Sequence, residues 1–146
     1  MHNLGETRSV RRADHLLLTP DTFVRAPLPG MKKCMAIVHV APAIGAAFTQ
    51  YTAEFEASGE LGDTPAQRFV YVLEGAVKVD AEGKKGELGP GGYAFLPEGA
   101  DHSDNSIETT IRTTAIAIDC HRNIVCANGM TPVICSSGFG RLAAFA

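Results

Sequence analysis

The stretch "GGYAFLPEGADHSDN", residues 91–105, decides the fold. Gly91 is followed by five residues and then Pro97, Gly99 comes one residue later, and His102 follows after two more. Turn residues therefore bound the apolar run YAFLP, which predicts a short strand between two turns. The histidine that ends the series is a candidate metal ligand, because neutral imidazole is the side chain that most often binds metals.

Short β-strands are predicted along most of the chain. They alternate or run apolar, and they are separated by segments rich in Gly, Pro and Asp. The predicted strands are residues 35–40, 48–56, 68–75, 76–80, 93–97 and 109–119, and the predicted turns or loops are 58–67, 81–86 and 87–92. No segment shows a clean helical period. The pattern predicts an all-β protein, a double-stranded barrel of the jelly-roll kind.

Composition narrows the class of protein. The chain has 146 residues, 45% of them hydrophobic, which is enough for one domain with a core. Its net charge of −3, without a stripe of Lys and Arg, argues against a nucleic-acid partner. No apolar run suits a signal peptide or a membrane span, so we expect a cytoplasmic protein whose four cysteines are free thiols.

Three segments carry a resemblance to a known family. They are "LLLTPDTFVRAPLPG" (16–30), "FVYVLEG" (69–75) and "LGPGGYAFLPEG" (88–99). Over residues 14–119 the chain resembles the N-terminal half of the (S)-ureidoglycine aminohydrolases, also called glyoxylate-induced proteins or DUF861. The resemblance implies an RmlC-like cupin barrel, one of two in each family member. It also implies a family reaction in allantoin and purine breakdown, which releases ammonia from ureidoglycine and leaves ureidoglycolate.

The resemblance also bears on metal binding. Manganese and the catalytic residues of this family belong to the second barrel, and a barrel like this one lacks the ligands. The first cupin motif has two histidines, a glutamate four residues later and a strand that ends in Gly. Counted back from Gly75, these positions fall at Gly62, Thr64 and Arg68. A guanidinium is always cationic and cannot ligate a metal. The series Gly91, Pro97, Gly99 and His102 is the second cupin motif. His102 is the one ligand position that is retained, so no metal is expected here.

Other residues could still complete a metal site. His39 and either Glu54 or Glu60 could converge on His102, although no spacing in the sequence requires it. This alternative makes the chain a standalone metal-dependent enzyme.

Arg68 is the strongest candidate for binding a ligand. It shares one face of its strand with Val70 and Val72. If the cupin motif holds, that face lies inside the barrel, where a guanidinium can bind a small carboxylate with two hydrogen bonds. Gln50 and Tyr93 are the additional candidate contacts. The alternatives are a salt bridge from Arg68 to Glu54 or Asp63, or a position at the barrel mouth.

The chain divides into an arm (1–29), a barrel (30–119) and an atypical tail (120–146). The tail, "CHRNIVCANGMTPVICSSGFGRLAAFA", changes abruptly to Cys and small residues. It could belong to a natural single-barrel protein, a cloned fragment or a shifted reading frame, and we favour the shifted frame. We expect it to pack poorly or to exchange a strand at a dimer contact. Burial of Ile134 and Phe139 in the core would argue against foreign sequence.

The expected role of the chain alone follows from these assignments. Phe69, Tyr71 and Phe95 are aromatic residues suited to a core or to a contact between barrels. Without a second barrel, an apolar outer face favours self-association. We therefore expect a structural, homodimeric barrel with little or no activity of its own.

Overall fold

The computed structural model describes residues 9–12, 15–62, 64–81, 84–97, 106–109, 111–120 and 133–135. The strands are β1 (Val10–Arg11), β2 (Leu16–Leu17), β3 (Val24–Ala26), β4 (Lys32–Val40), β5 (Phe48–Glu60), β6 (Gln67–Glu74), β7 (Val77–Ala81), β8 (Lys84–Leu88), β9 (Tyr93–Leu96), β10 (Ser106–Glu108), β11 (Thr113–Cys120) and β12 (Val133–Cys135). The described helices are two 3-10 turns, η1 (Pro20–Thr22) and η2 (Pro42–Ile44). Neither has the length to cross a bilayer.

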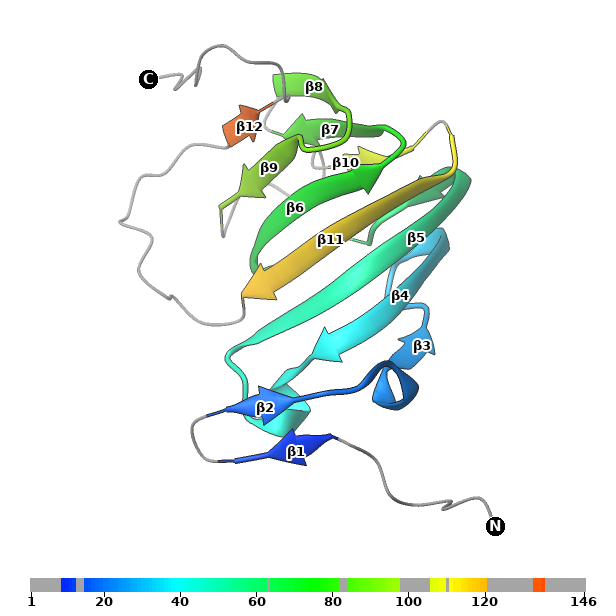
Figure 1. Ribbon diagram of the computed structural model, residues 1–146. Coiled ribbons are helices and arrows are strands. Elements are labelled where there is room, and N and C mark those ends of the chain that lie inside the picture. Colours follow the sequence, from blue (N-terminus) through cyan, green and yellow to red (C-terminus); the bar gives the residue numbers. More distant parts are fainter. Residues whose placement is uncertain are drawn as a thin grey trace.

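One antiparallel sheet holds every strand except the β1–β2 hairpin. Its order is β12-β9-β6-β11-β5-β10-β7-β8, and β4 adds to β5 with β3 beyond it. Figure 1 shows β9, β6, β11, β5 and β4 as one broad, twisted layer, with β7, β8 and β10 gathered at its upper end. The sheet curls into a nearly closed barrel, so the predicted jelly-roll fold is confirmed.

The core lies on one face of this sheet, as the period-2 pattern requires. On β6, Val70 and Val72 are fully buried, whereas Tyr71 and Leu73 between and beyond them are 38% and 40% exposed. On β5 the buried set is Tyr51, Ala53 and Phe55; on β11 it is Thr113, Ala115, Ala117 and Asp119. The inward residues of β11 are thus small or polar.

Several boundaries differ from the sequence-based prediction. β5 continues to Glu60, through an irregular register opposite Lys32 and Cys34, where a loop was predicted from residue 58. β8 occupies residues for which turns were predicted. Its sequence, KKGEL, carries three charged residues, which suit an edge strand, and Leu88 is its one buried residue. β3 joins the sheet from within the predicted arm.

The tail contributes β12 to the described part of the chain. Its backbone pairs with β9, so that Ile134 lies opposite Ala94. The side chains of β12, and Phe139, lie outside what the structure describes. Whether the tail packs poorly, exchanges a strand or is foreign sequence stays a prediction.

The turn at Gly75 gives the first testable prediction. Gly75 has φ +84° and precedes Ala76, whose N–H donates to Thr113 Oγ1 at 3.1 Å. A Cβ at position 75 would press on that hydroxyl and lie 2.7 Å from the carbonyl oxygen of Arg112. Gly75→Ala should therefore lower the free energy of unfolding by about 1–3 kcal/mol, measured by urea denaturation.

Gly89→Ala is the matched control, because a Cβ at position 89 has no heavy atom within 4 Å. It should change stability by no more than about 0.5 kcal/mol. Equal losses from the two substitutions would contradict this account of the turn.

Candidate functional site

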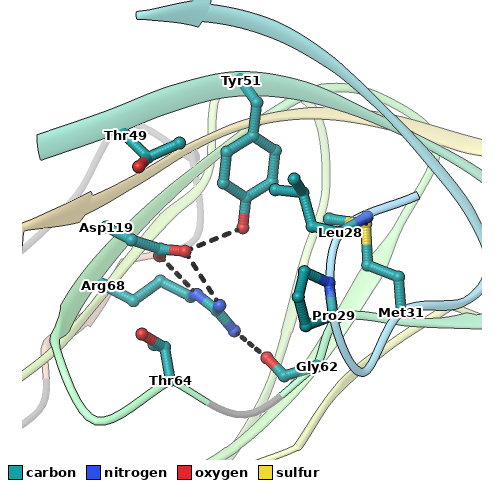
Figure 2. A pocket seen from close by; sticks show the side chains of 9 residues that line it. All are labelled: Leu28, Pro29, Met31, Thr49, Tyr51, Gly62, Thr64, Arg68 and Asp119. Atoms are coloured by element: carbon teal, nitrogen blue, oxygen red, sulfur yellow. Dashed lines mark hydrogen bonds and ion pairs between the residues drawn. The ribbon is translucent and has the colours of Figure 1, made fainter. Parts of the chain in front are cut away.

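A buried ion pair spans the inner face of β6 and β11. Arg68, near the start of β6, lies directly opposite Asp119 in the antiparallel register, and each is 7% exposed. Arg68 Nε donates to Asp119 Oδ1 at 2.7 Å, and Nη2 donates to Oδ2 at 3.0 Å (Figure 2). Two parallel bonds between ionised groups form the strongest pairing open to an arginine.

Two further groups complete this network. Arg68 Nη1 donates to the carbonyl oxygen of Gly62 at 2.6 Å, and the Tyr51 hydroxyl donates to Asp119 Oδ2 at 3.2 Å. Burial raises the pKa of Tyr51 above its ordinary value, although the positive charge of Arg68 acts the other way. The phenol therefore stays protonated and keeps donating to the carboxylate.

A cavity of about 240 Å³ lies beside the ion pair. Its walls are Leu28, Pro29, Met31, Thr49, Tyr51, Gly62, Thr64, Arg68 and Asp119. In Figure 2 the apolar residues of the segment between β3 and β4 stand on one side, and the ion pair and hydroxyl groups stand on the other. The cavity thus has an apolar wall and a polar wall.

Gly62 is where the arm meets the barrel. A Cβ at position 62 would press on the carbonyl oxygen of Pro29 and lie 2.6 Å from Gly30 Cα. The backbone of the arm therefore occupies the space that a side chain at position 62 would need.

The first-motif positions do reach the cavity, but they do not fit a metal. Gly62 offers no ligand and has no room for one, and Arg68 brings a positive charge that already engages Asp119. Within the described residues no group of three or more His, Cys, Asp or Glu side chains gathers. His102 lies outside the described part of the chain, so its role as a ligand stays a prediction.

The residues considered as partners for His102 have other partners. His39 Nε2 lies 2.8 Å from Thr52 Oγ1, and burial lowers the pKa of this histidine. Glu54 forms an exposed ion pair with Arg25, and Glu60 Oε2 accepts from Lys32 Nζ at 2.7 Å.

Arg68 does form a salt bridge, as one of the alternatives predicted, but its partner is Asp119 and not Glu54. Asp63, the other predicted partner, lies outside the described residues. The sequence carries one signal for this partner. Asp119 alternates in phase with Ala115 and Ala117, and such small residues mark the inner face.

Gln50 and Tyr93 lie on the other face of the sheet from Arg68. Gln50 is opposite Ile118 in the register, and Tyr93 is opposite Tyr71. Directly paired residues project to the same side of a sheet, and Tyr71 faces outward. The three predicted ligand contacts therefore do not share one site. A ligand role for any one of them stays a prediction.

The large apolar side chains on the outer side of β6, β9 and β11 form a second feature, the apolar outer face. Its members are Phe69, Tyr71, Leu73, Tyr93, Phe95, Ile116 and Ile118. They meet across the strands: Ile116 is opposite Tyr71, Ile118 is opposite Phe69, and Phe69 is opposite Phe95. The rings of Phe69 and Tyr93 stack with their centroids 5.9 Å apart. This sheet face is partly exposed along its length.

A family model for the EutQ-like cupin domain matches residues 43–116. The chain belongs to this cupin family. The cupin is 33% identical over 108 residues to the (S)-ureidoglycine aminohydrolase of Arabidopsis thaliana, and the aligned region covers 72% of this chain and 36% of that protein. It is 34% identical over 101 residues to the Escherichia coli K12 enzyme of the same name, covering 66% of this chain and 39% of that protein.

A solved structure agrees with these matches. The Ylba protein of E. coli, of the DUF861 family, superposes with a TM-score of 0.73 at 25% identity, over 89% of this cupin and 55% of that chain. The resemblance to ureidoglycine aminohydrolases is therefore confirmed. The cupin spans little more than a third of the length of these two curated relatives, 36% and 39%.

The buried ion pair gives the second testable prediction. Asp119→Asn leaves the Arg68 charge buried without its counter-charge and should lower the free energy of unfolding by about 3–5 kcal/mol. Glu54→Gln is the control, because it breaks the exposed Arg25–Glu54 pair and should cost no more than about 1 kcal/mol.

Urea denaturation of both variants measures the difference. The double variant Arg68→Met, Asp119→Leu should recover only part of the lost stability, because it removes the unpaired charge but leaves the Tyr51 hydroxyl and the Gly62 carbonyl without their partners. If Asp119→Asn and Glu54→Gln cost the same, Asp119 does not neutralise a buried charge.

Proposed function

We propose that this barrel is an assembly domain of the ureidoglycine aminohydrolase kind, which packs against another barrel and performs no metal-dependent hydrolysis itself. One observation carries the proposal: Arg68, which the count back from Gly75 assigns to the glutamate position of the first cupin motif, forms a buried ion pair with Asp119. A catalytic metal needs converging imidazole or carboxylate groups and an open coordination position. This interior offers a guanidinium and a carboxylate that bind each other.

The relatives support an assembly role within a larger unit. Two of them are named for ammonia release from ureidoglycine, and in both the matched region is little more than a third of the protein, 36% and 39%. The family activity then belongs to an assembly that includes residues beyond this barrel. The contribution of this barrel is the surface against which its partner packs.

We propose that, for this chain by itself, the partner is a second copy of the chain, bound through the apolar outer face. None of the seven residues of that face is charged, so two copies can approach without repulsion there. A two-fold axis brings one patch against its own copy and covers both at once. The exposure of Tyr71 and Leu73, 38% and 40%, is the unfavourable surface that such a contact removes.

The proposal is tested by sedimentation velocity over a range of protein concentrations. The natural chain should be a dimer, and Tyr71→Lys should shift it to a monomer, because a charge in the centre of the contact would be buried without a partner. Val24→Lys is the matched control: Val24 is 62% exposed but lies on β3, away from the patch, so this variant should stay a dimer.

A monomer at high concentration, or a Tyr71→Lys variant that remains a dimer, would count against this interface. Circular dichroism establishes that each variant is folded before its association is compared.

A further inference from the structure

We infer that the cavity beside Arg68 and Asp119 binds a small, uncharged primary amide. This inference concerns the interior of the barrel and does not depend on the proposed assembly through the outer face. It starts from the size of the cavity, about 240 Å³. Water in the liquid takes about 30 Å³ per molecule, and pockets for large organic ligands begin near 300 Å³. The cavity therefore suits several waters or one compact organic molecule.

The charges of the cavity favour a ligand with no net charge. Among the described residues that line it, Arg68 and Asp119 are the ionised groups, and they neutralise each other at 2.7 and 3.0 Å. A ligand carboxylate brought into this buried site would lose its hydration without meeting an unmatched positive charge.

The polar wall presents two acceptors. Asp119 accepts from Arg68 Nε at Oδ1, and from Arg68 Nη2 and the Tyr51 hydroxyl at Oδ2. A carboxylate has about four lone-pair sites, so Oδ1 can accept one further bond. The Tyr51 oxygen donates its proton to Asp119 and retains its own acceptor capacity. Asp119 Oδ1 and the Tyr51 oxygen can therefore each accept a hydrogen bond from an N–H group of the ligand.

The wall also presents a donor. The Thr64 hydroxyl oxygen accepts from the backbone N–H of Ala66 at 3.3 Å, which leaves its proton to donate. A primary amide has two N–H donors for Asp119 and Tyr51 and one carbonyl oxygen for Thr64. Its alkyl group would contact the opposite wall of Leu28, Pro29 and Met31.

The probes are isobutyramide and isobutyrate, which have nearly the same shape and differ in charge and in N–H donors. Each is titrated into the ¹⁵N-labelled full chain, and amide shifts are followed by NMR. Isobutyramide should move the signals of Tyr51, Thr64 and Arg68 in a saturable way. It should bind at least about tenfold more tightly than isobutyrate, because the carboxylate has no N–H donors and its negative charge would be buried.

Thr64→Val removes the donor while keeping the shape of the side chain, and it should weaken isobutyramide binding about fivefold. Thr114→Val, the same substitution on the outer phase of β11, should leave binding unchanged. Isobutyrate binding as tightly as the amide would overturn the inference in favour of a carboxylate site at Arg68. Absence of saturable shifts at the cavity residues, or an unchanged affinity in Thr64→Val, would overturn it altogether.

Discussion

The ion pair between Arg68 and Asp119 is the interaction on which the interior of this barrel depends. It joins the start of β6 to the end of β11 across 51 residues of sequence. It also holds the Gly62 carbonyl, and Gly62 in turn packs against the backbone of Pro29 and Gly30. One guanidinium thus links two strands, a loop and the arm. Inside a low-dielectric barrel such a network must be satisfied throughout, because any orphaned member would be costly.

The two faces of the same strands separate two roles. Alternation along β6 turns Arg68 inward with Val70, and it turns Phe69 and Tyr71 outward. The inner face carries the ion pair, which lines a small cavity. The outer face stays apolar and partly exposed, which fits a domain whose partner surface lies outside the barrel. Arg68, at the position counted as the motif glutamate, brings a guanidinium to the inner face, where Asp119 binds it.

Much of the fold could be predicted because its signals are local. Period-2 alternation and Gly–Pro punctuation predict the main strands and the jelly-roll class, and they put Arg68 on one face with Val70 and Val72. The cupin resemblance predicts that this face is the inner one. The charged edge strand β8 escaped prediction because Leu88 is its one buried residue. The sequence places Gly75 at the end of one predicted strand and before the next, and its φ of +84° shows why glycine stands there.

The site was harder to predict because its contacts join distant strands. Asp119 neighbours Arg68 only because β11 inserts between β5 and β6, which no local pattern reveals. The sequence alone does not give the register between strands, so it cannot show that Gln50 and Tyr93 lie on a different face from Arg68. That register puts them on the outer side, opposite Ile118 and Tyr71. Residue type suggested the chemistry, but strand adjacency decides which side chains meet.

We propose that the Arg68–Asp119 ion pair replaces a metal in the interior of this barrel. The most direct test is the metal content of the purified chain, measured by mass spectrometry after incubation with manganese and dialysis. We expect far less than one manganese per chain, because the first-motif positions offer no ligand set. One tightly bound manganese per chain, lost in His102→Ala, would contradict the claim and support a standalone metal enzyme instead.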